Sequence, residues 1–141
     1  VRQKVFPFVE KKIKATFHDP CYLCRHNNIC IAPREALEGI PGLELVEMKR
    51  SKLSSFCCGG GGGNFYTDMI GGFENSPSRI RVREAYDTGA EVLAVACPLC
   101  LKMLDDAIKS EGLDDKIKVK DVAEIMIDAM SRESKGARTN E

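Results

Sequence analysis

The sequence lacks three features that mark large classes of proteins: an excess of charge of one sign, a long apolar segment and a signal segment. Its 21 basic residues balance 21 acidic residues, which argues against binding to nucleic acid or to a membrane surface. The longest apolar run, residues 92–96, is far shorter than the roughly 20 residues that cross a bilayer. No signal segment is visible at residues 1–4. We therefore expect a cytoplasmic domain with no membrane contact of its own.

The length and the cysteine content indicate how many domains the chain forms and what its cysteines do. A chain of 141 residues, 43% of them hydrophobic, can bury the core of one domain without disulfide bonds. Its seven cysteines are an odd number, which fits a complete set of disulfides poorly, so reduced thiols that hold a metal are the better expectation. We expect one domain over residues 1–130 and a flexible tail over residues 131–141. Because the first residue is not Met, we expect this domain to be part of a longer protein, in which other segments or partners could provide a membrane attachment.

The most unusual segment is residues 57–63, where two adjacent cysteines are followed by five glycines. Glycine lets the backbone approach a bound group closely and direct N–H groups at sulfur. A flexible surface loop with incidental thiols is the alternative. A phosphate-binding loop does not fit, because no lysine follows Gly63 and the Gly-x-Gly-x-x-Gly pattern fails at Asn64. We predict a sulfur-ligand loop whose first glycines contact a bound cofactor: Gly59, Gly60 and Gly61.

The pattern of apolar residues predicts four strands. Residues 13–18 alternate between apolar and polar side chains, as in a strand with one buried face, and residues 43–48 form a second strand. The continuous apolar run at residues 91–96 is typical of a strand covered on both faces of a parallel sheet. Ile117 and Val119 indicate a short fourth strand.

Helix signals lie between and after these strands. Prolines at the start and glycines at the end predict helices over residues 33–39 and 76–89, with a third helix beginning after Cys97-Pro98. A capping-box pattern at residues 121–124 opens a last helix that ends near residue 130. Residues 65–75 receive no assignment. Strands that alternate with helices predict an α/β fold, with a small, mostly parallel four-stranded sheet flanked by helices.

Five cysteines follow the predicted strands directly, one after the first strand and two after each of the next two. The carboxyl ends of parallel strands meet at one edge of the sheet, where open α/β sheets bind ligands. If Pro98 is the first helical residue, Cys97 caps that helix and Cys100 lies in its first turn, where the helix dipole favours thiolate. We therefore predict one metal site at this carboxyl edge, formed by Cys21, Cys57, Cys58, Cys97 and Cys100.

The number of thiolates bears on the cofactor. Five sulfurs exceed the four ligands of a structural zinc site, whereas an iron–sulfur cluster can use an extra thiolate, so iron–sulfur is favoured over zinc. A zinc-binding structural module of an electron-transfer complex is the main alternative. Thiol–disulfide exchange at Cys97 and Cys100 without any metal is a third hypothesis, but it leaves the other cysteines and the glycines unexplained.

Three segments together carry a resemblance to a known family. They are Phe-His-Asp-Pro-Cys-Tyr-Leu at residues 17–23, Phe-Cys-Cys-Gly-Gly-Gly-Gly-Gly at 56–63 and Ala-Cys-Pro-Leu-Cys at 96–100. Over residues 16–122 the chain resembles the CCG domain, a cysteine-rich module of the heterodisulfide reductase catalytic subunit. The same module occurs in iron–sulfur subunits of glycolate and lactate oxidases and in quinone-linked iron–sulfur oxidoreductases.

The resemblance implies that the five cysteines, in a C-x35-CC-x38-CxxC pattern, ligate a noncubane [4Fe–4S] cluster. It implies single-electron transfer, with a disulfide or thiol as substrate, and no catalytic residue beyond the cluster ligands. The implied partners are ferredoxin-type, flavoprotein or quinone-linked subunits or domains. The reductases contain two copies of the motif and this sequence contains one, so the second cluster would belong to another segment or to a partner. Some relatives hold zinc in one copy, which keeps the zinc hypothesis open.

Two further cysteines, Cys24 and Cys30, depart from the family pattern, which has glycine at the position of Cys24. They are spare thiols, replacement ligands, or half of a separate zinc site with His18 or His26, and we favour spare thiols. For His18 we expect a polar contact at the end of a strand rather than metal ligation.

Overall fold

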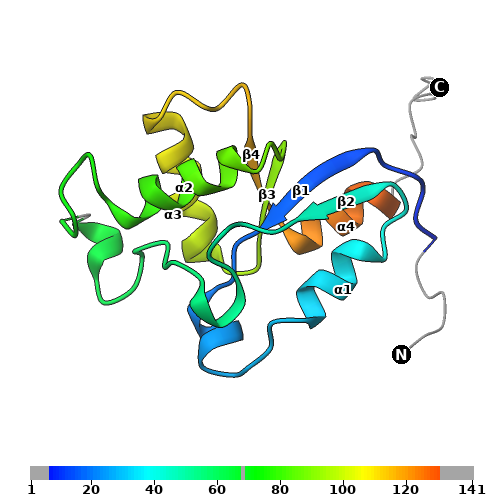
Figure 1. Ribbon diagram of the computed structural model, residues 1–141, viewed down its shortest axis with the longest axis horizontal. Coiled ribbons are helices and arrows are strands. Elements are labelled where there is room, and N and C mark those ends of the chain that lie inside the picture. The colour runs from blue at the N-terminus through cyan, green and yellow to red at the C-terminus, as the bar shows by residue number, and fades with distance from the viewer. Residues whose placement is uncertain (1–6, 68, 131–141) are drawn as a thin grey trace, which may run out of the picture.

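The strands assemble into one parallel sheet in a computed structural model that describes residues 7–67 and 69–130. The strand order is β2-β1-β3-β4, and each neighbouring pair is parallel (Figure 1). This confirms the predicted α/β fold, while the predicted tail at residues 131–141 lies outside the described residues. The bounds of the strands are β1 Ile13–Phe17, β2 Leu43–Val46, β3 Val92–Val95 and β4 Lys118–Asp121.

Four α-helices within the described residues begin where the sequence signals lie. Proline occupies one of the first two positions of three of them, where the missing N–H costs no hydrogen bond. The last helix begins with the predicted capping box, in which the Asp121 N–H donates to Glu124 Oε2 at 2.9 Å and the Ala123 N–H donates to Asp121 Oδ1 at 2.8 Å. The bounds are α1 Ala32–Glu38, α2 Pro77–Asp87, α3 Pro98–Ser110 and α4 Val122–Met130.

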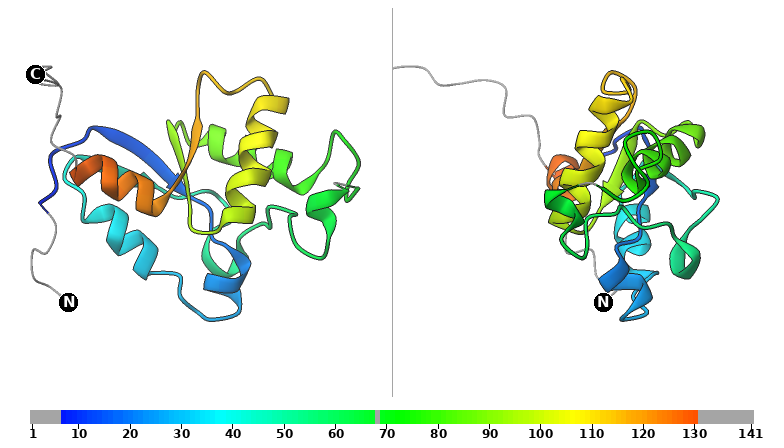
Figure 2. Two further views of the ribbon diagram at one scale, coloured as in Figure 1. Left: turned by 180° about the vertical axis from the view of Figure 1, so that it is seen from behind. Right: turned by 90° about the vertical axis from the view of Figure 1, so that its left-hand side faces the viewer.

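Two helices cover each face of the sheet (Figures 1 and 2). Helices α1 and α4 pack over Phe17 and Ala94, with Leu37 and Ile125 in the same core. Helices α2 and α3 form a second core on the other face, which contains Leu93 and Val95 of β3 and also two of the predicted ligands, Cys58 and Cys100. No helix in the described part of the chain has the length and apolar character needed to span a membrane.

Strand β1 differs from the prediction of one buried face. Ala15, Thr16 and Phe17 are all fully buried, because β1 lies between β2 and β3 with helices over both faces of the sheet. The alternation of polar residues in the sequence hid this position, since Thr16 is buried although it is polar. Its hydroxyl oxygen has no hydrogen-bond partner among the described residues.

The segments that follow β1, β2 and β3 gather at one end of the sheet (Figures 1 and 2). A π-helical turn, Cys21–Arg25, follows β1, and a 3-10 turn, Lys52–Ser54, follows β2 just before the paired cysteines. Strand β3 leads directly into α3 through Cys97. The fold therefore brings all three cysteine-bearing segments to the carboxyl edge, as predicted.

Candidate metal centre

A buried pair of sulfur atoms lies at the centre of this edge. Cys58 Sγ and Cys100 Sγ are 3.3 Å apart, and a ring nitrogen of His18 completes a group whose ligand atoms all lie within 4.8 Å of one another. Each of the three side chains is at most 4% exposed. Thiolate and imidazole are the ligands that zinc and iron prefer in proteins. The three come from loops after β1 and β2 and from the first turn of α3, so only the folded chain makes the group.

The other three predicted ligands lie at the same edge, in the segments that follow β1, β2 and β3. Cys57 is the sequence neighbour of Cys58, Cys97 is the N-cap residue of α3, and Cys21 begins the π-helical turn after β1. All three are partly exposed and carry free thiols. Within residues 7–67 and 69–130, the tight group of ligand atoms does not extend to these three sulfurs. The fold thus brings two of the five sulfurs into contact, with Cys57 beside them, and places Cys21 and Cys97 on the same edge.

The adjacent thiols of Cys57 and Cys58 retain their protons strongly. Its hydrogen bond to Cys100, together with burial, raises the pKa of Cys58 to about 12. The hydrogen bond to Cys58 and then burial raise the pKa of Cys57 well above its usual range. Since a cation takes the place of such protons when it binds thiolates, this pair is suited to a metal rather than to free thiolate chemistry.

The first two glycines of the run lie close to the sulfurs. The Gly59 N–H donates to Cys57 Sγ at 3.3 Å, and the φ of Gly59 is +82°, in the left-handed region that glycine adopts without strain. An ideal Cβ on Gly60 would lie 3.0 Å from Met103 Cγ and 3.6 Å from Cys58 Sγ. By contrast, an ideal Cβ on Gly61 would meet no atom within 4 Å. The structure therefore favours glycine at the first two positions of the run, through the positive φ of Gly59 and the close packing at Gly60, but not at Gly61.

Asn64 holds the glycine loop in place. Its Nδ2 donates to the Gly59 carbonyl at 2.7 Å, and its Oδ1 accepts from the N–H groups of Met69 and Ile70 at 3.0 and 3.2 Å. The side chain is 5% exposed. Glycines have no side chain that could make these hydrogen bonds. Through Met69 and Ile70, Asn64 also ties the glycine loop to the segment 65–75, for which the sequence predicted no structure.

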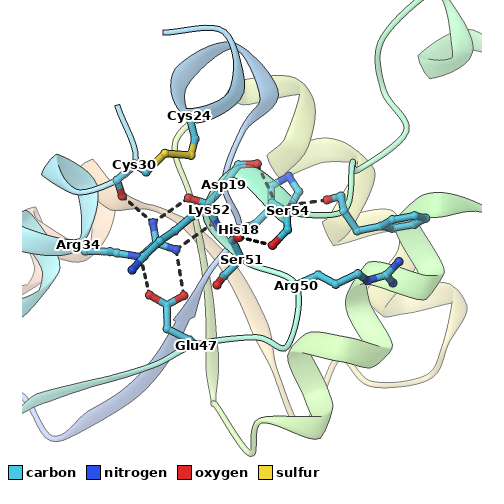
Figure 3. Close-up of polar contacts among 12 residues, drawn as sticks. His18, Asp19, Cys24, Cys30, Arg34, Glu47, Arg50, Ser51, Lys52 and Ser54 are labelled. Carbon is cyan, nitrogen blue, oxygen red and sulfur yellow. Dashed lines mark hydrogen bonds and ion pairs between the residues drawn. A yellow bond between two sulfur atoms is a disulfide. The ribbon is translucent and has the colours of Figure 1, made fainter. Parts of the chain in front are cut away.

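Asp19 joins the first two cysteine segments (Figure 3). Its carboxylate accepts two hydrogen bonds from Arg34 of α1, at 2.7 and 2.9 Å, and one from the Lys52 N–H at 2.7 Å. Arg34 also donates to the Cys30 carbonyl and to Glu47. Because Asp19 precedes Cys21 by two residues and Lys52 precedes Cys57 by five, this network fixes one ligand segment against the other.

His18 makes the polar contact that the sequence predicted. Its Nδ1 accepts a hydrogen bond at 3.1 Å from Nε of Arg81, a residue of α2 that is itself fully buried. Burial, and then the charge of Arg81, lower the pKa of His18 to about 3, so the imidazole is neutral at physiological pH.

Cys24 and Cys30 form a disulfide (Figure 3). The prediction that they are spare thiols is therefore wrong, and as a disulfide they cannot be thiolate ligands in this state. Cys24 lies in the π-helical turn three residues after Cys21, and the chain folds back so that Cys30 meets it. Asn28, at a φ of +58°, lies in the reversal. The five cysteines that remain free are the five of the predicted ligand pattern.

Sequence reasoning missed four polar residues that support this edge: Asp19, Arg34, Asn64 and Arg81. Asp19 and Asn64 had a detectable signal, since each adjoins a cysteine or glycine motif. The two arginines had none, because a charged residue on a helix is usually exposed.

The chain belongs to the CCG family. Residues 15–105 match the sequence profile of this family, which is described as a cysteine-rich domain. That range contains the three segments on which the resemblance was based, together with Asp19, Arg34 and Arg81.

Several named proteins share this region. The chain is 41% identical over 111 residues to the probable iron-sulfur-binding oxidoreductase FadF of Bacillus subtilis, a match that covers 79% of this chain and 16% of the relative. It is 43% identical over 117 residues to a probable membrane-anchored ferredoxin of Chromohalobacter salexigens, covering 83% and 17%. It is 40% identical over 117 residues to a subunit of the dihydromethanophenazine:CoB--CoM heterodisulfide reductase of Methanosarcina barkeri, covering 82% and 27%.

The chain therefore spans between 16% and 27% of the length of these three relatives. No solved structure matches it significantly.

Proposed function

We propose that this chain is the cluster-bearing domain of an oxidoreductase related to heterodisulfide reductases. In this proposal a noncubane [4Fe–4S] cluster is ligated by the five free cysteines: Cys21, Cys57, Cys58, Cys97 and Cys100. The observation that carries the proposal is the sorting of the cysteines. Five thiols that match the family pattern stay free at one edge of the sheet, whereas the two outside the pattern pair with each other.

The residues present fit such a group. Soft sulfur donors are the ligands of iron–sulfur clusters, and the contact of 3.3 Å between Cys58 and Cys100 brings two of them to one point. Main-chain N–H groups directed at sulfur, such as that of Gly59 on Cys57, stabilise negative charge on thiolates and sulfides. A bound cluster would supply single-electron transfer, in this proposal to a disulfide substrate that is reduced to thiols.

The electron count bears on the partners. Cleaving a disulfide into two thiols takes two electrons and two protons, so a domain that passes single electrons needs two successive transfers. The relatives' names place them among oxidoreductases, ferredoxins and reductase subunits. We infer that the chain is one domain of a longer protein and that another domain or subunit, of ferredoxin, flavoprotein or quinone-linked type, supplies the electrons.

Anaerobic purification followed by iron and acid-labile sulfide assays tests the cluster. We expect about four irons and four sulfides per chain, with an electron paramagnetic resonance signal that changes when a thiol substrate is added. Cys58→Ser should lose most of the iron. The matched control is the double variant Cys24→Ser/Cys30→Ser, which changes two cysteines outside the ligand set and should keep it. Preparations that repeatedly contain stoichiometric zinc and no iron would eliminate the proposal.

A zinc-binding structural module is the second candidate. The tight group of His18, Cys58 and Cys100 favours it, because zinc accepts nitrogen and sulfur ligands in tetrahedral sites. In this case a strong zinc chelator should lower the melting temperature of zinc-loaded protein by many degrees. An unchanged melting temperature after the zinc has been removed would count against a structural zinc.

A further inference from the structure

We propose that His18 is an N–H donor to metal-bound sulfur at this centre, and that Arg81 prevents His18 from acting as a ligand. The inference rests on the proposed function, in that it assigns a role toward the same metal site. In this role His18 is a positioning residue that adjusts the charge on the sulfurs.

The backbone and the core fix the position of His18. It follows the last residue of β1, and its N–H continues the sheet by donating to the Ala94 carbonyl of β3 at 2.9 Å. The residue is 1% exposed, and a ring nitrogen lies within 4.8 Å of the sulfurs of Cys58 and Cys100. The ring is therefore held between the sheet and the sulfur pair.

Arg81 determines which ring nitrogen carries the proton. Its Nε–H donates to His18 Nδ1 at 3.1 Å, and a guanidinium has only donors. Nδ1 must therefore present its lone pair to Arg81. A neutral imidazole carries one N–H, so the proton lies on Nε2.

The orientation of Arg81 is itself fixed. Its Nη1 donates to the Arg50 carbonyl at 2.7 Å and to Glu84 Oε2 at 2.9 Å, while its Nη2 donates to Ser55 Oγ at 3.3 Å. The side chain is fully buried. A flip of the guanidinium would break several of these bonds at once, so the donor on Nδ1 is permanent.

This arrangement decides between ligation and donation. A neutral histidine that binds a metal through Nε2 must carry its proton on Nδ1, and here that proton would face the Nε–H of Arg81. Donation from Nε2–H to a cysteine thiolate or a sulfide keeps every donor paired with an acceptor. Such hydrogen bonds to sulfur stabilise the more negative, reduced state of a cluster and raise its reduction potential.

The tautomer can be measured without any metal. In the full chain labelled with ¹⁵N-histidine, the ring nitrogen shifts of His18 should report Nε2–H in metal-free protein and in zinc-loaded protein. The chain contains only two histidines, and the exposed His26 provides an internal reference. A proton on Nδ1 of His18 in either sample would overturn the proposal, whether or not the protein assembles a cluster.

The role toward the metal is tested by His18→Phe, which keeps an aromatic ring of similar size and removes the donor. We expect unchanged iron and sulfide content and about a tenfold fall in the equilibrium constant for reduction, which is about 59 mV for one electron. His26→Phe is the control and should leave the potential unchanged. Loss of iron from folded His18→Phe, or an unchanged potential, would overturn the proposal.

A second measurement covers the case in which His18→Phe does not fold. In cluster-loaded wild-type protein, ¹⁵N-histidine should show only weak hyperfine coupling to the paramagnetic cluster, and a strong coupling of an iron-bound nitrogen would overturn the proposal. If wild-type protein assembles no cluster at all, the proposed function fails, and the tautomer measurement still decides the assignment of His18 as a donor.

Discussion

Asp19 is a carboxylate with a structural role next to a predicted ligand. It is 4% exposed and accepts hydrogen bonds from Arg34 and from the Lys52 N–H. A buried charge is stable only when it is paired and hydrogen-bonded, and here the pairing also joins two of the three segments that carry the cysteines. Asp19, two residues before Cys21, therefore holds the segment after β1 against the segment that leads to Cys57.

We expect Asp19→Asn to lower the free energy of unfolding by roughly 2–3 kcal/mol, because it removes one charge of a buried pair and leaves Arg34 with less compensation. Urea unfolding measures this change. The control is Asp105→Asn, whose partner Lys109 is mostly exposed, and it should leave the urea midpoint unchanged. An Asp19→Asn midpoint equal to that of wild type would show that the network contributes nothing to stability.

At the scale of elements, the glycine run and the neighbouring disulfide loop shape the edge of the sheet. The run turns at Gly59 and is held by Asn64. The disulfide closes a short loop that begins within the π-helical turn. The Asn64 hydrogen bonds and the disulfide both fix the conformation of loop segments, which belong to no strand or α-helix.

Two alanine substitutions separate the glycine that is needed from the one that is not. Gly59→Ala should lower the free energy of unfolding by roughly 1–2 kcal/mol, because alanine is strained at positive φ and its Cβ would lie 3.0 Å from Pro77 Cβ. Gly61→Ala adds the same atom in open space, at a φ outside the left-handed region, and should change stability by less than about 0.5 kcal/mol. Equal urea midpoints for the two variants would contradict this interpretation of the loop.

The disulfide makes a prediction of its own. Its cysteines are six positions apart, and closing a loop of this size removes about 2 kcal/mol of conformational entropy from the unfolded chain. The double variant Cys24→Ala/Cys30→Ala should therefore be less stable than wild type by roughly 2 kcal/mol in buffer without a reductant. Adding a dithiol should bring wild type toward the variant and leave the variant unchanged. If the dithiol leaves wild-type stability unaltered, the disulfide does not contribute in this way.

At the scale of the whole molecule, two cores on opposite faces of the sheet share β3. The core under α2 and α3 contains Cys58 and Cys100, so the metal site is continuous with the main hydrophobic packing. Glu111, just after α3, links the end of α3 to α2 by accepting hydrogen bonds from Arg79 and Arg83.

Global stability should fall in acid because of Glu111. The hydrogen bond from Arg83, and also that from Arg79, keep the pKa of Glu111 below its ordinary value of 4.5. Since the folded-state pKa is the lower one, the stabilisation is fully present above the ordinary pKa and is lost as pH falls through the folded-state value. The urea midpoint should therefore start to drop as pH falls below about 4.5 and should continue to drop in stronger acid. Glu111→Gln should show a smaller drop, and an identical drop would assign the acid sensitivity to other carboxylates.

The extent to which sequence predicts this molecule depends on the range of each interaction. The start of α3 at Cys97-Pro98 and the capping box of α4 were predictable, because caps are set by residues within one turn. The burial of Thr16 was not, because it depends on which strands and helices come to lie beside β1. The role of Arg81 could not be predicted for a related reason. Apart from Glu84, three positions along the same helix, its partners are His18, Arg50 and Ser55, which lie at least 26 positions away.

The sequence by itself determined the fold class and the five-cysteine pattern, because periodicity and motif spacing are local properties that survive without coordinates. Only the tertiary structure decided which cysteines stay free, that Cys58 and Cys100 come into contact, and that Arg81 faces His18. These outcomes depend on where three separate loops meet and on which charges the core excludes from water. The physical reason is that burial, proton position and sulfur pairing are set by neighbours in space, which the linear order of residues does not specify.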